Sequence, residues 1–461
     1  MKIVLVRYHD NDNVNTRLPE ALNKVQGVYP PLGISYIAAI LKQKGYDVQI
    51  IDTQALNITN REFESMIRSI KPDVVGITAM TPTIRGAMKA AMICKSHGAI
   101  VVMGGPHIAT LPNETMASSF IDYGLIGEGD YSFLALIQYI EGKIVSLKNV
   151  EGIIYKHNKK VIINKAALVE NLDELPFPAR ELLPNDRYDC IITEKPFTTM
   201  ISSRGCPYRC GFCFKTPSDN KNRTRNPKNI VDEMEYCIDK FKVKEIMFYD
   251  DTLTLNREVI VKVCEEIISR KLDINWEAPT RVNHIDLELL KLMKKAGCIR
   301  LRYGVESGDQ SILNLMRKGT TIDQIRKVFK WSHEVGIETF AYFIIGYYSE
   351  TPQTMQNTIN FAKEINPDWA MFTVATPLPK THLHELALKD NLIPQNYWEE
   401  FTELKRNDRL PYLVPDADKW VKKAYRSFYF RPSFVIKKIR KLNSWDTLKK
   451  YIDGARGIIE L

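Results

Sequence analysis

The sequence lacks long apolar runs. Nowhere in its 461 residues do about 18 uncharged apolar residues follow one another, the length that a bilayer-spanning helix needs. The first residues, MKIVLVRYHDNDN, hold a short apolar run that returns to polar residues, whereas a secretory signal peptide needs a longer apolar core. The sequence therefore excludes a membrane-spanning protein and predicts a cytoplasmic one.

Acidic residues are nearly absent from residues 419–450. This stretch holds eleven Lys and Arg against one acid, Asp446, so it contributes +10 to a net charge of +9. Its aromatic residues are Trp420, Tyr425, Phe428, Tyr429, Phe430, Phe434 and Trp445. Three interpretations stay open: packing of an amphipathic helix on the rest of the protein, peripheral contact with an anionic membrane, or binding of an acidic protein. We expect no nucleic-acid partner.

Cysteine occurs at eight positions, and no feature directs the chain to an oxidising compartment, so we expect thiols rather than disulfides. Cys94, Cys237, Cys264 and Cys298 have apolar neighbours and are predicted to be core residues in helices or at their ends. Cys190 is expected in the core or in a loop, with a place facing the active cavity as the alternative.

Short β-branched runs alternate with helical stretches in residues 1–145. The candidate strands are 2–6, 47–52, 73–78, 99–105 and 122–127, and candidate helices cover 32–44 and 84–96. This alternation predicts an α/β fold with a doubly wound, Rossmann-like parallel sheet. Residues 146–190 then predict a hairpin at 152–164 and a linker rich in Pro and acid.

The alternation resumes in residues 191–385 with six further candidate strands, at 197–203, 245–250, 273–278, 299–305, 338–346 and 369–375. Six such units predict a partial (β/α)6 barrel of the TIM type. After the first unit, Asn226 and Pro227 are typical of a helix start. Residues 386–461 are expected to form a helical extension.

Three cysteines, Cys206, Cys210 and Cys213, stand within eight residues between a predicted strand and a predicted helix. Three thiolates on one loop suit an iron–sulfur cluster, whereas a structural zinc site needs a fourth ligand, and no further Cys or His lies close by in sequence. A [4Fe–4S] cluster held in this way leaves one iron open for a substrate or cofactor.

The C-x3-C-x2-C spacing, with SSRG at 202–205 and Phe212 before the last Cys, resembles the radical S-adenosylmethionine superfamily. In that family the open iron binds the amino and carboxylate groups of S-adenosylmethionine, and reduction of the cluster cleaves it to methionine and a 5′-deoxyadenosyl radical. The resemblance implies these two cofactors and an external electron donor of the flavodoxin or ferredoxin type.

The same resemblance implies contacts to S-adenosylmethionine by Phe212 and by residues that follow the barrel strands. These are Tyr249, Asp250 and Asp251, Arg281 as a partner of the methionine carboxylate, and Glu306 with Ser307. For the three carboxylates, loop capping or a surface ion pair is the alternative. Two loops depart from the family's glycines: Ser349 stands in G-Y-Y-S-E-T and Lys380 in T-P-L-P-K-T, where Lys380 either stabilises a turn or binds a substrate anion.

Residues 1–145 resemble the cobalamin-binding domain fused to many of these enzymes. Small residues at the strand ends of such a domain let a flat corrin approach the backbone. The implied contacts are Pro31, Leu32, Gly33, Thr78, Gly104, Gly105, His107, Gly127, Glu128 and Gly129. The D-x-H-x-x-G motif that supplies a cobalt ligand elsewhere is absent, which leaves the lower axial face unassigned. His9 and His107 are candidate ligands or structural histidines, and a domain that has lost its corrin is an alternative.

Together these resemblances imply a cobalamin-dependent radical S-adenosylmethionine methyltransferase. An unactivated carbon is no nucleophile, so it must first lose a hydrogen atom to a radical before methylcobalamin delivers a methyl group. The substrate is expected to be a small molecule, lipid or peptide. The alternatives are a cyclase or oxidative enzyme without methyl transfer, like the anaerobic porphyrin cyclase, and an iron–sulfur binding or sensing protein without turnover.

Overall fold

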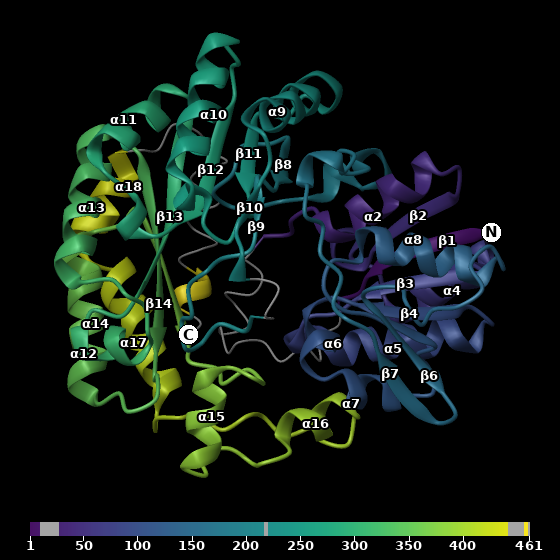
Figure 1. The fold of residues 1–461 in the computed structure, drawn as a ribbon. Helices are drawn as coiled ribbons and strands as arrows, with labels where there is room; N and C mark the ends of the chain where they lie inside the picture. The colour runs from purple at the N-terminus through teal and green to yellow at the C-terminus, as the bar shows by residue number, and fades with distance from the viewer. Residues whose placement is uncertain (10–26, 216–219, 441–455, 460–461) are drawn as a thin grey trace.

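The computed structural model describes residues 1–9, 27–215, 220–440 and 456–459. These residues form two α/β units, an N-terminal domain and a barrel domain, that lie side by side (Figure 1). The predicted fold class is confirmed.

The N-terminal sheet has seven strands in the order β2-β1-β3-β4-β5-β6-β7. Its parallel strands are β1 (Lys2–Arg7), β2 (Asp47–Asp52), β3 (Val74–Thr78), β4 (Ile100–Gly104) and β5 (Tyr123–Leu125). The predicted hairpin, β6 (Ile153–His157) and β7 (Lys160–Ile163), pairs antiparallel with β5. The sheet therefore continues past residue 145 into the segment expected to lead to the linker.

Helices cover both faces of this sheet. Alternation along β1 sends Ile3 and Leu5 to one core and Val4 and Val6 to the other, as the pleat requires. On the first face lie α2 (Leu32–Gln43) and α8 (Gly129–Ile140); on the second lie α4 (Asn60–Ile70), α5 (Ile84–Ser96), α6 (Pro106–Thr110) and α7 (Pro112–Ala117). A short helix, α3 (Thr53–Leu56), follows β2.

The barrel domain contains a six-stranded, all-parallel sheet in the order β15-β14-β13-β12-β11-β8. Its strands are β8 (Phe197–Met200), β11 (Glu245–Phe248), β12 (Asn275–Thr280), β13 (Cys298–Glu306), β14 (Glu338–Ile345) and β15 (Trp369–Val374). The helices that follow these strands are α9 (Pro227–Phe241), α10 (Arg257–Ser269), α11 (Leu287–Lys295), α12 (Gln310–Leu315), α13 (Ile322–Val335) and α14 (Pro352–Ile365). The open sheet confirms a partial barrel.

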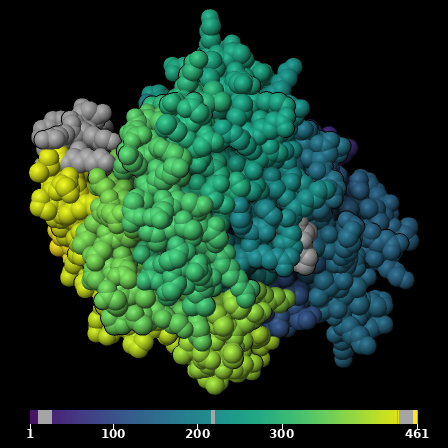
Figure 2. All heavy atoms as spheres, turned by 60° about the vertical axis from the view of Figure 1, so that its left-hand side comes forward, coloured from purple at the N-terminus to yellow at the C-terminus, as the bar shows by residue number. Residues whose placement is uncertain are grey.

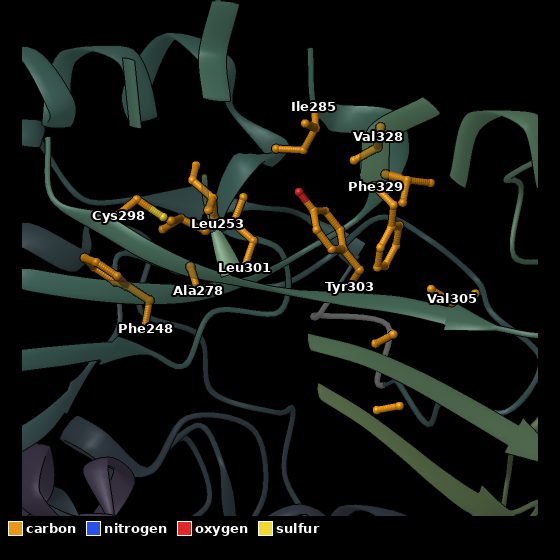
Figure 3. Packing of buried hydrophobic residues seen from close by; sticks show 14 of the residues in the cluster. Phe248, Leu253, Ala278, Ile285, Cys298, Leu301, Tyr303, Val305, Val328 and Phe329 are labelled. Carbon is orange, nitrogen blue, oxygen red and sulfur yellow. The ribbon is translucent and has the colours of Figure 1, made fainter. Parts of the chain in front are cut away.

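The main core lies between this sheet and its helices. Figure 3 shows Leu301, Tyr303 and Val305 of β13 with Val328 and Phe329 of α13. Arg300 and Arg302, on the other face of β13, instead form ion pairs with Glu277 of the neighbouring strand β12. Cys298, predicted in a helix or at its end, is the first residue of β13, although it is buried as expected.

A small antiparallel ribbon connects the two domains. Its strands are β9 (Ser203–Arg204) and β10 (Arg223–Thr224), and they flank the cysteine loop in sequence. After the barrel come α15 (His382–Lys389) and α16 (Tyr397–Thr402), which reach from the barrel to the N-terminal domain (Figures 1 and 2).

The C-terminal helices are α17 (Ala417–Tyr429) and α18 (Pro432–Arg440). Tyr425, Phe428 and Phe434 are buried in the barrel core, where the ring of Tyr425 also meets that of Phe372 of β15 edge to face at 5.3 Å. The packing interpretation thus accounts for these aromatic residues, while membrane contact through residues 419–450 stays a prediction, and Trp445 lies outside the described residues. In the described part of the chain no helix is both long enough and apolar enough to span a bilayer.

Candidate functional site

The cysteine loop follows the ribbon and is tied to the barrel by its backbone. Gly211, at the centre of the loop, donates its N–H to Met316 O at 2.8 Å and accepts from Leu383 N at 2.8 Å. A side chain at Gly211 would place its Cβ 2.7 Å from the Tyr347 hydroxyl, so the close approach requires glycine. Lys215 Nζ closes the loop by donating to Cys206 O at 2.8 Å.

The three cysteines of the loop lie close enough to influence one another electrostatically. Cys206 is buried and Cys213 is exposed, yet desolvation raises the pKa of the Cys213 thiol to about 11, with Cys210, Asp251 and Cys206 adding to the shift and Lys215 opposing it. Among the described residues, no three Cys, His, Asp or Glu side chains are grouped closely enough to hold a single metal ion.

Arg281, Phe212 and Glu306, which the resemblance implies as contacts to S-adenosylmethionine, all lie near Lys318 beside the loop. Arg281 Nη1 lies 3.4 Å from Cys210 Sγ, and its guanidinium stacks 3.8 Å above the ring of Tyr208. Glu306 is buried and pairs with Lys318 Nζ at 2.8 Å, and the same ammonium lies 5.9 Å from the Phe212 ring. These groups supply a guanidinium, a carboxylate and an aromatic face next to the thiols.

Asp250 and Ser307, two residues predicted to contact S-adenosylmethionine, form hydrogen bonds with other side chains. Asp250 is buried and accepts hydrogen bonds from the hydroxyls of Ser202 at 2.7 Å and Ser203 at 2.5 Å, and burial raises its pKa. Ser307 is also buried and bonds to Thr358 of α14 at 3.1 Å. Both side chains therefore have hydrogen-bond partners within the fold.

Tyr249 and Asp251, on either side of Asp250, are exposed instead. Tyr249 is 48% exposed, and desolvation raises the pKa of its hydroxyl; its ring meets Tyr29 of the N-terminal domain edge to face at 5.9 Å. Tyr29 in turn lies 3.0 Å from the thiol of buried Cys190. The predicted linker cysteine thus lies in the seam between the domains.

The two loops that depart from the family pattern adopt the backbone conformation that glycine favours. Ser349 has φ 65° and Lys380 has φ 60°. Both side chains are exposed, whereas neighbouring Glu350 is buried and accepts from Tyr347 N at 2.9 Å. The conformation explains why glycine is usual at these positions.

A cavity of about 320 Å³ opens at the carboxyl ends of the N-terminal strands. Seven predicted residues line it: Gly33, Thr78, Gly104, Gly105, Gly127, Glu128 and Gly129. A Cβ built on Gly33 meets no atom within 4 Å and one on Gly104 meets only Leu125 at 3.9 Å, so absent side chains leave this space open. Its glycine walls fit an extended or flat group that lies against the backbone.

Pro31, Leu32 and His107 do not line this cavity. His107 is buried between Thr81 Oγ1 at 3.2 Å and Thr402 Oγ1 at 3.1 Å, and desolvation lowers its pKa to about 3. It therefore acts as a neutral structural histidine that joins α6 to α16. His9 lies just after β1, where its N–H donates to Thr53 Oγ1 at 2.8 Å.

The barrel domain also lines the cavity, through Ile201 and Arg204, and this contact was not predicted. The signal was present in the sequence, since Arg204 belongs to the SSRG segment two residues before Cys206. Lys318, the partner of Glu306, was also missed. The only sign of Lys318 in the sequence is that it follows shortly after the apolar stretch ILNLM.

The fold and the two sites define a class. Residues 200–362 match the radical SAM superfamily, and residues 21–137 match the B12 binding domain. The chain belongs to the family of radical S-adenosylmethionine enzymes that carry a B12-binding domain.

Two similar proteins show the family at the level of sequence. An uncharacterised methyltransferase of Pyrococcus horikoshii is 36% identical over 426 residues, 91% of this chain and 92% of that protein. The anaerobic magnesium-protoporphyrin IX monomethyl ester cyclase of Rubrivivax gelatinosus is 32% identical over 429 residues, 89% of this chain and 76% of that protein.

Solved structures share the arrangement of the domains. The radical S-adenosylmethionine methyltransferase TsrM from Kitasatospora setae, solved with cobalamin and a [4Fe–4S] cluster, superposes with a TM-score of 0.71 at 17% identity over 94% of this chain and 90% of that chain. OxsB, solved with aqua-cobalamin and S-adenosylmethionine, gives 0.70 at 18% identity over 100% and 71%. At these identities the likeness concerns the fold.

Proposed function

We propose that the chain is a cobalamin-dependent radical S-adenosylmethionine methyltransferase that transfers a methyl group to an unactivated carbon. The observation that carries the proposal is that the cavity of the B12-type domain is walled in part by Arg204, two residues before the first cysteine of the cluster loop. One chain thus brings a glycine-lined cofactor cavity and a three-thiol loop to a common seam.

The residues at the seam have distinct tasks in this proposal. Cys206, Cys210 and Cys213 would hold a [4Fe–4S] cluster, and Arg281, Glu306 and Phe212 lie where they would bind S-adenosylmethionine. Arg281 presents a guanidinium suited to a carboxylate. When bound, these cofactors supply a carbon-centred radical and a transferable methyl group, chemistry that protein side chains lack.

In this proposal the substrate binds between the domains. Tyr249 of the barrel and Tyr29 of the N-terminal domain meet there, and Arg302 of β13 donates to Tyr342 Oη at 3.2 Å deeper in the barrel. These aromatic and guanidinium groups suit a small molecule, lipid or peptide with an apolar reacting carbon. An external electron donor of the flavodoxin or ferredoxin type would reduce the cluster.

The test begins with anaerobic purification in the presence of hydroxocobalamin, followed by measurement of iron, sulfide and cobalt. About four irons and one cobalt per chain are expected. Incubation with reductant and S-adenosylmethionine should then give 5′-deoxyadenosine. Protein that binds iron without cobalt would overturn methyl transfer from cobalamin.

A second candidate has specific support from the similarity to the Rubrivivax gelatinosus cyclase, a protein named for ring formation. Product mass distinguishes the two reactions. With S-adenosylmethionine that carries a deuterated methyl group, a methyltransferase gives a product 17 mass units above its substrate, whereas cyclisation transfers no deuterated methyl group.

A further inference from the structure

The ribbon β9–β10 is held by both domains. On the barrel side, Asp250 accepts hydrogen bonds from Ser202 and Ser203, as described above. On the other side, Arg204 forms a two-fold contact with Asp130 of the N-terminal domain, at 2.7 and 3.2 Å. Gly205, with φ 89°, then turns the chain directly into Cys206. The first residue of the cysteine loop therefore starts from a segment clamped between two domains.

The charges on this ribbon are balanced by the N-terminal domain. Arg204 and Arg223 are cross-strand partners, an arrangement that is unfavourable for two like charges. Arg223 contacts Glu128 at 2.7 and 2.9 Å, and Arg204 contacts Asp130 and, at 3.5 Å, Glu128. Although burial opposes the charged form of Glu128, the bonds from Arg223 and the charge of Arg204 outweigh it and lower the pKa of this carboxyl.

The two carboxylates that pair with these arginines, Glu128 and Asp130, stand at the start of α8 and border the cavity. Gly127, Glu128, Gly129 and Asp130 all line the cavity, and Arg204 lines it as well. The Arg204 guanidinium also lies 5.2 Å from the ring of Tyr36, which belongs to α2 and to the same wall. A group that fills the cavity would therefore lie against the residues that hold the start of the cysteine loop.

We infer that Arg204 is a positioning residue that couples occupancy of the N-terminal cavity to the order of the cysteine loop. The inference rests on the proposed function in that it takes cobalamin and the cluster as the two occupants. Coupling between two binding sites is reciprocal, so the cluster must tighten cobalamin binding by the same factor by which cobalamin tightens the cluster. This coupling is separate from any direct contact that Arg204 makes with cobalamin.

The experiment measures the ratio of the hydroxocobalamin affinities of the protein with and without its cluster. Hydroxocobalamin is titrated anaerobically by visible absorbance into full-length protein with and without its reconstituted cluster. For the wild type we expect cobalamin to bind at least about 5-fold more tightly when the cluster is present, the lower end of typical coupling between sites. Arg204→Gln and Asp130→Asn, on opposite sides of the contact, should each bring the ratio close to 1, whatever they do to the affinity itself.

The controls separate this role from a structural one. Lys221→Gln removes a surface ion pair with Glu170 beside the ribbon, where the two side chains are 68% and 66% exposed, and should keep the wild-type ratio. Arg204→Lys keeps the charge without the planar fork and should give an intermediate ratio. The rate of iron loss to a chelator is measured with and without hydroxocobalamin, and the effect of hydroxocobalamin on this rate should rank the variants in the same order.

The outcomes also separate the inference from the proposed function. A wild-type ratio of 1, or an unchanged ratio in both Arg204→Gln and Asp130→Asn, overturns the coupling while cobalamin binding still supports the proposed function. Wild-type protein that binds no hydroxocobalamin overturns the proposed function and this inference together.

Discussion

The cavity of the N-terminal domain and the interior of the barrel are built in opposite ways. The cavity is open because Gly33 and Gly104 carry no side chain. The barrel interior is filled with paired charges: Arg300 contacts Glu277 at 2.7 Å and Glu245 at 3.2 Å, and Arg302 contacts Glu277 at 2.5 Å. One region is therefore sensitive to added volume, and the other to the loss of a partner and to pH.

The largest effect is expected in the barrel domain at the thiols. Cys206→Ala should abolish cluster assembly, because the proposed function assigns the cluster to three thiolates and no replacement ligand is near in sequence. Iron and sulfide are measured after anaerobic reconstitution. Cobalamin should still bind, since its cavity lies in the other domain, although with the weaker affinity of cluster-free protein.

Cys237→Ala is the matched control for this variant. Cys237 lies on α9 and is fully buried in the core, so its loss should lower stability by about 1 kcal/mol and leave the iron content unchanged. A Cys206→Ala protein that retains a full complement of iron would contradict the assignment of the loop.

The next effect is expected in the cavity. Gly33→Leu should weaken hydroxocobalamin binding by about 100-fold or more, because a leucine fills space that glycine leaves open, while iron content stays at the wild-type level. Leucine also favours the helix in which Gly33 lies, so the fold should be kept. Gly33→Ala adds only a methyl group and should bind much more like the wild type. Equal affinity for Gly33→Leu and the wild type would place the binding site elsewhere.

A smaller effect is expected on the stability of the barrel domain, which should depend on pH through Glu350. Burial raises the pKa of Glu350 from 4.5 to about 7. Between these values the folded state keeps a proton that the unfolded state releases, so stability falls as pH rises through this window. Glu350→Gln should remove this fall and stabilise the protein at pH 8 by up to about 3 kcal/mol.

Urea unfolding at pH 5 and pH 8 measures this difference. Glu288→Gln, at a side chain that is 75% exposed on α11, is the control and should leave the pH dependence as it is in the wild type. If Glu350→Gln and the wild type lose the same stability between the two pH values, the carboxyl is not protonated in the folded state.

The sequence allowed the elements and the cysteine loop to be predicted because their signals are local. β2 spans Asp47–Asp52 as expected, and α9 begins where Asn226 accepts from Lys228 N at 3.0 Å. Spacing alone identified the three thiols. The glycines of the cavity were found because the carboxyl ends of parallel strands converge at one edge of a sheet.

Local signals in the sequence did not predict where each side chain points or which residue it contacts. Asp250 and Ser307 follow barrel strands, as cofactor contacts do, but their oxygens bond to Ser202 and Thr358, residues distant in sequence. Arg204 was not among the predicted contacts, since its neighbours in sequence give no sign of its partner Asp130. Such pairings are set by how two domains pack, which no local pattern contains.

The smallest expected effect tests the seam at α16. The Thr402 hydroxyl donates to Trp398 O at 2.7 Å, so His107, kept neutral by its burial, donates from Nε2 to Thr402 Oγ1. Thr402→Val leaves this N–H buried without an acceptor and should cost about 1–2 kcal/mol. Hydrogen exchange should become faster in α16, whereas Thr81→Val, on the other side of the ring, should act mainly within the N-terminal domain. Unchanged exchange in α16 would show that apolar packing by Trp398 and Phe401, rather than the histidine, joins the extension to the cavity-bearing domain.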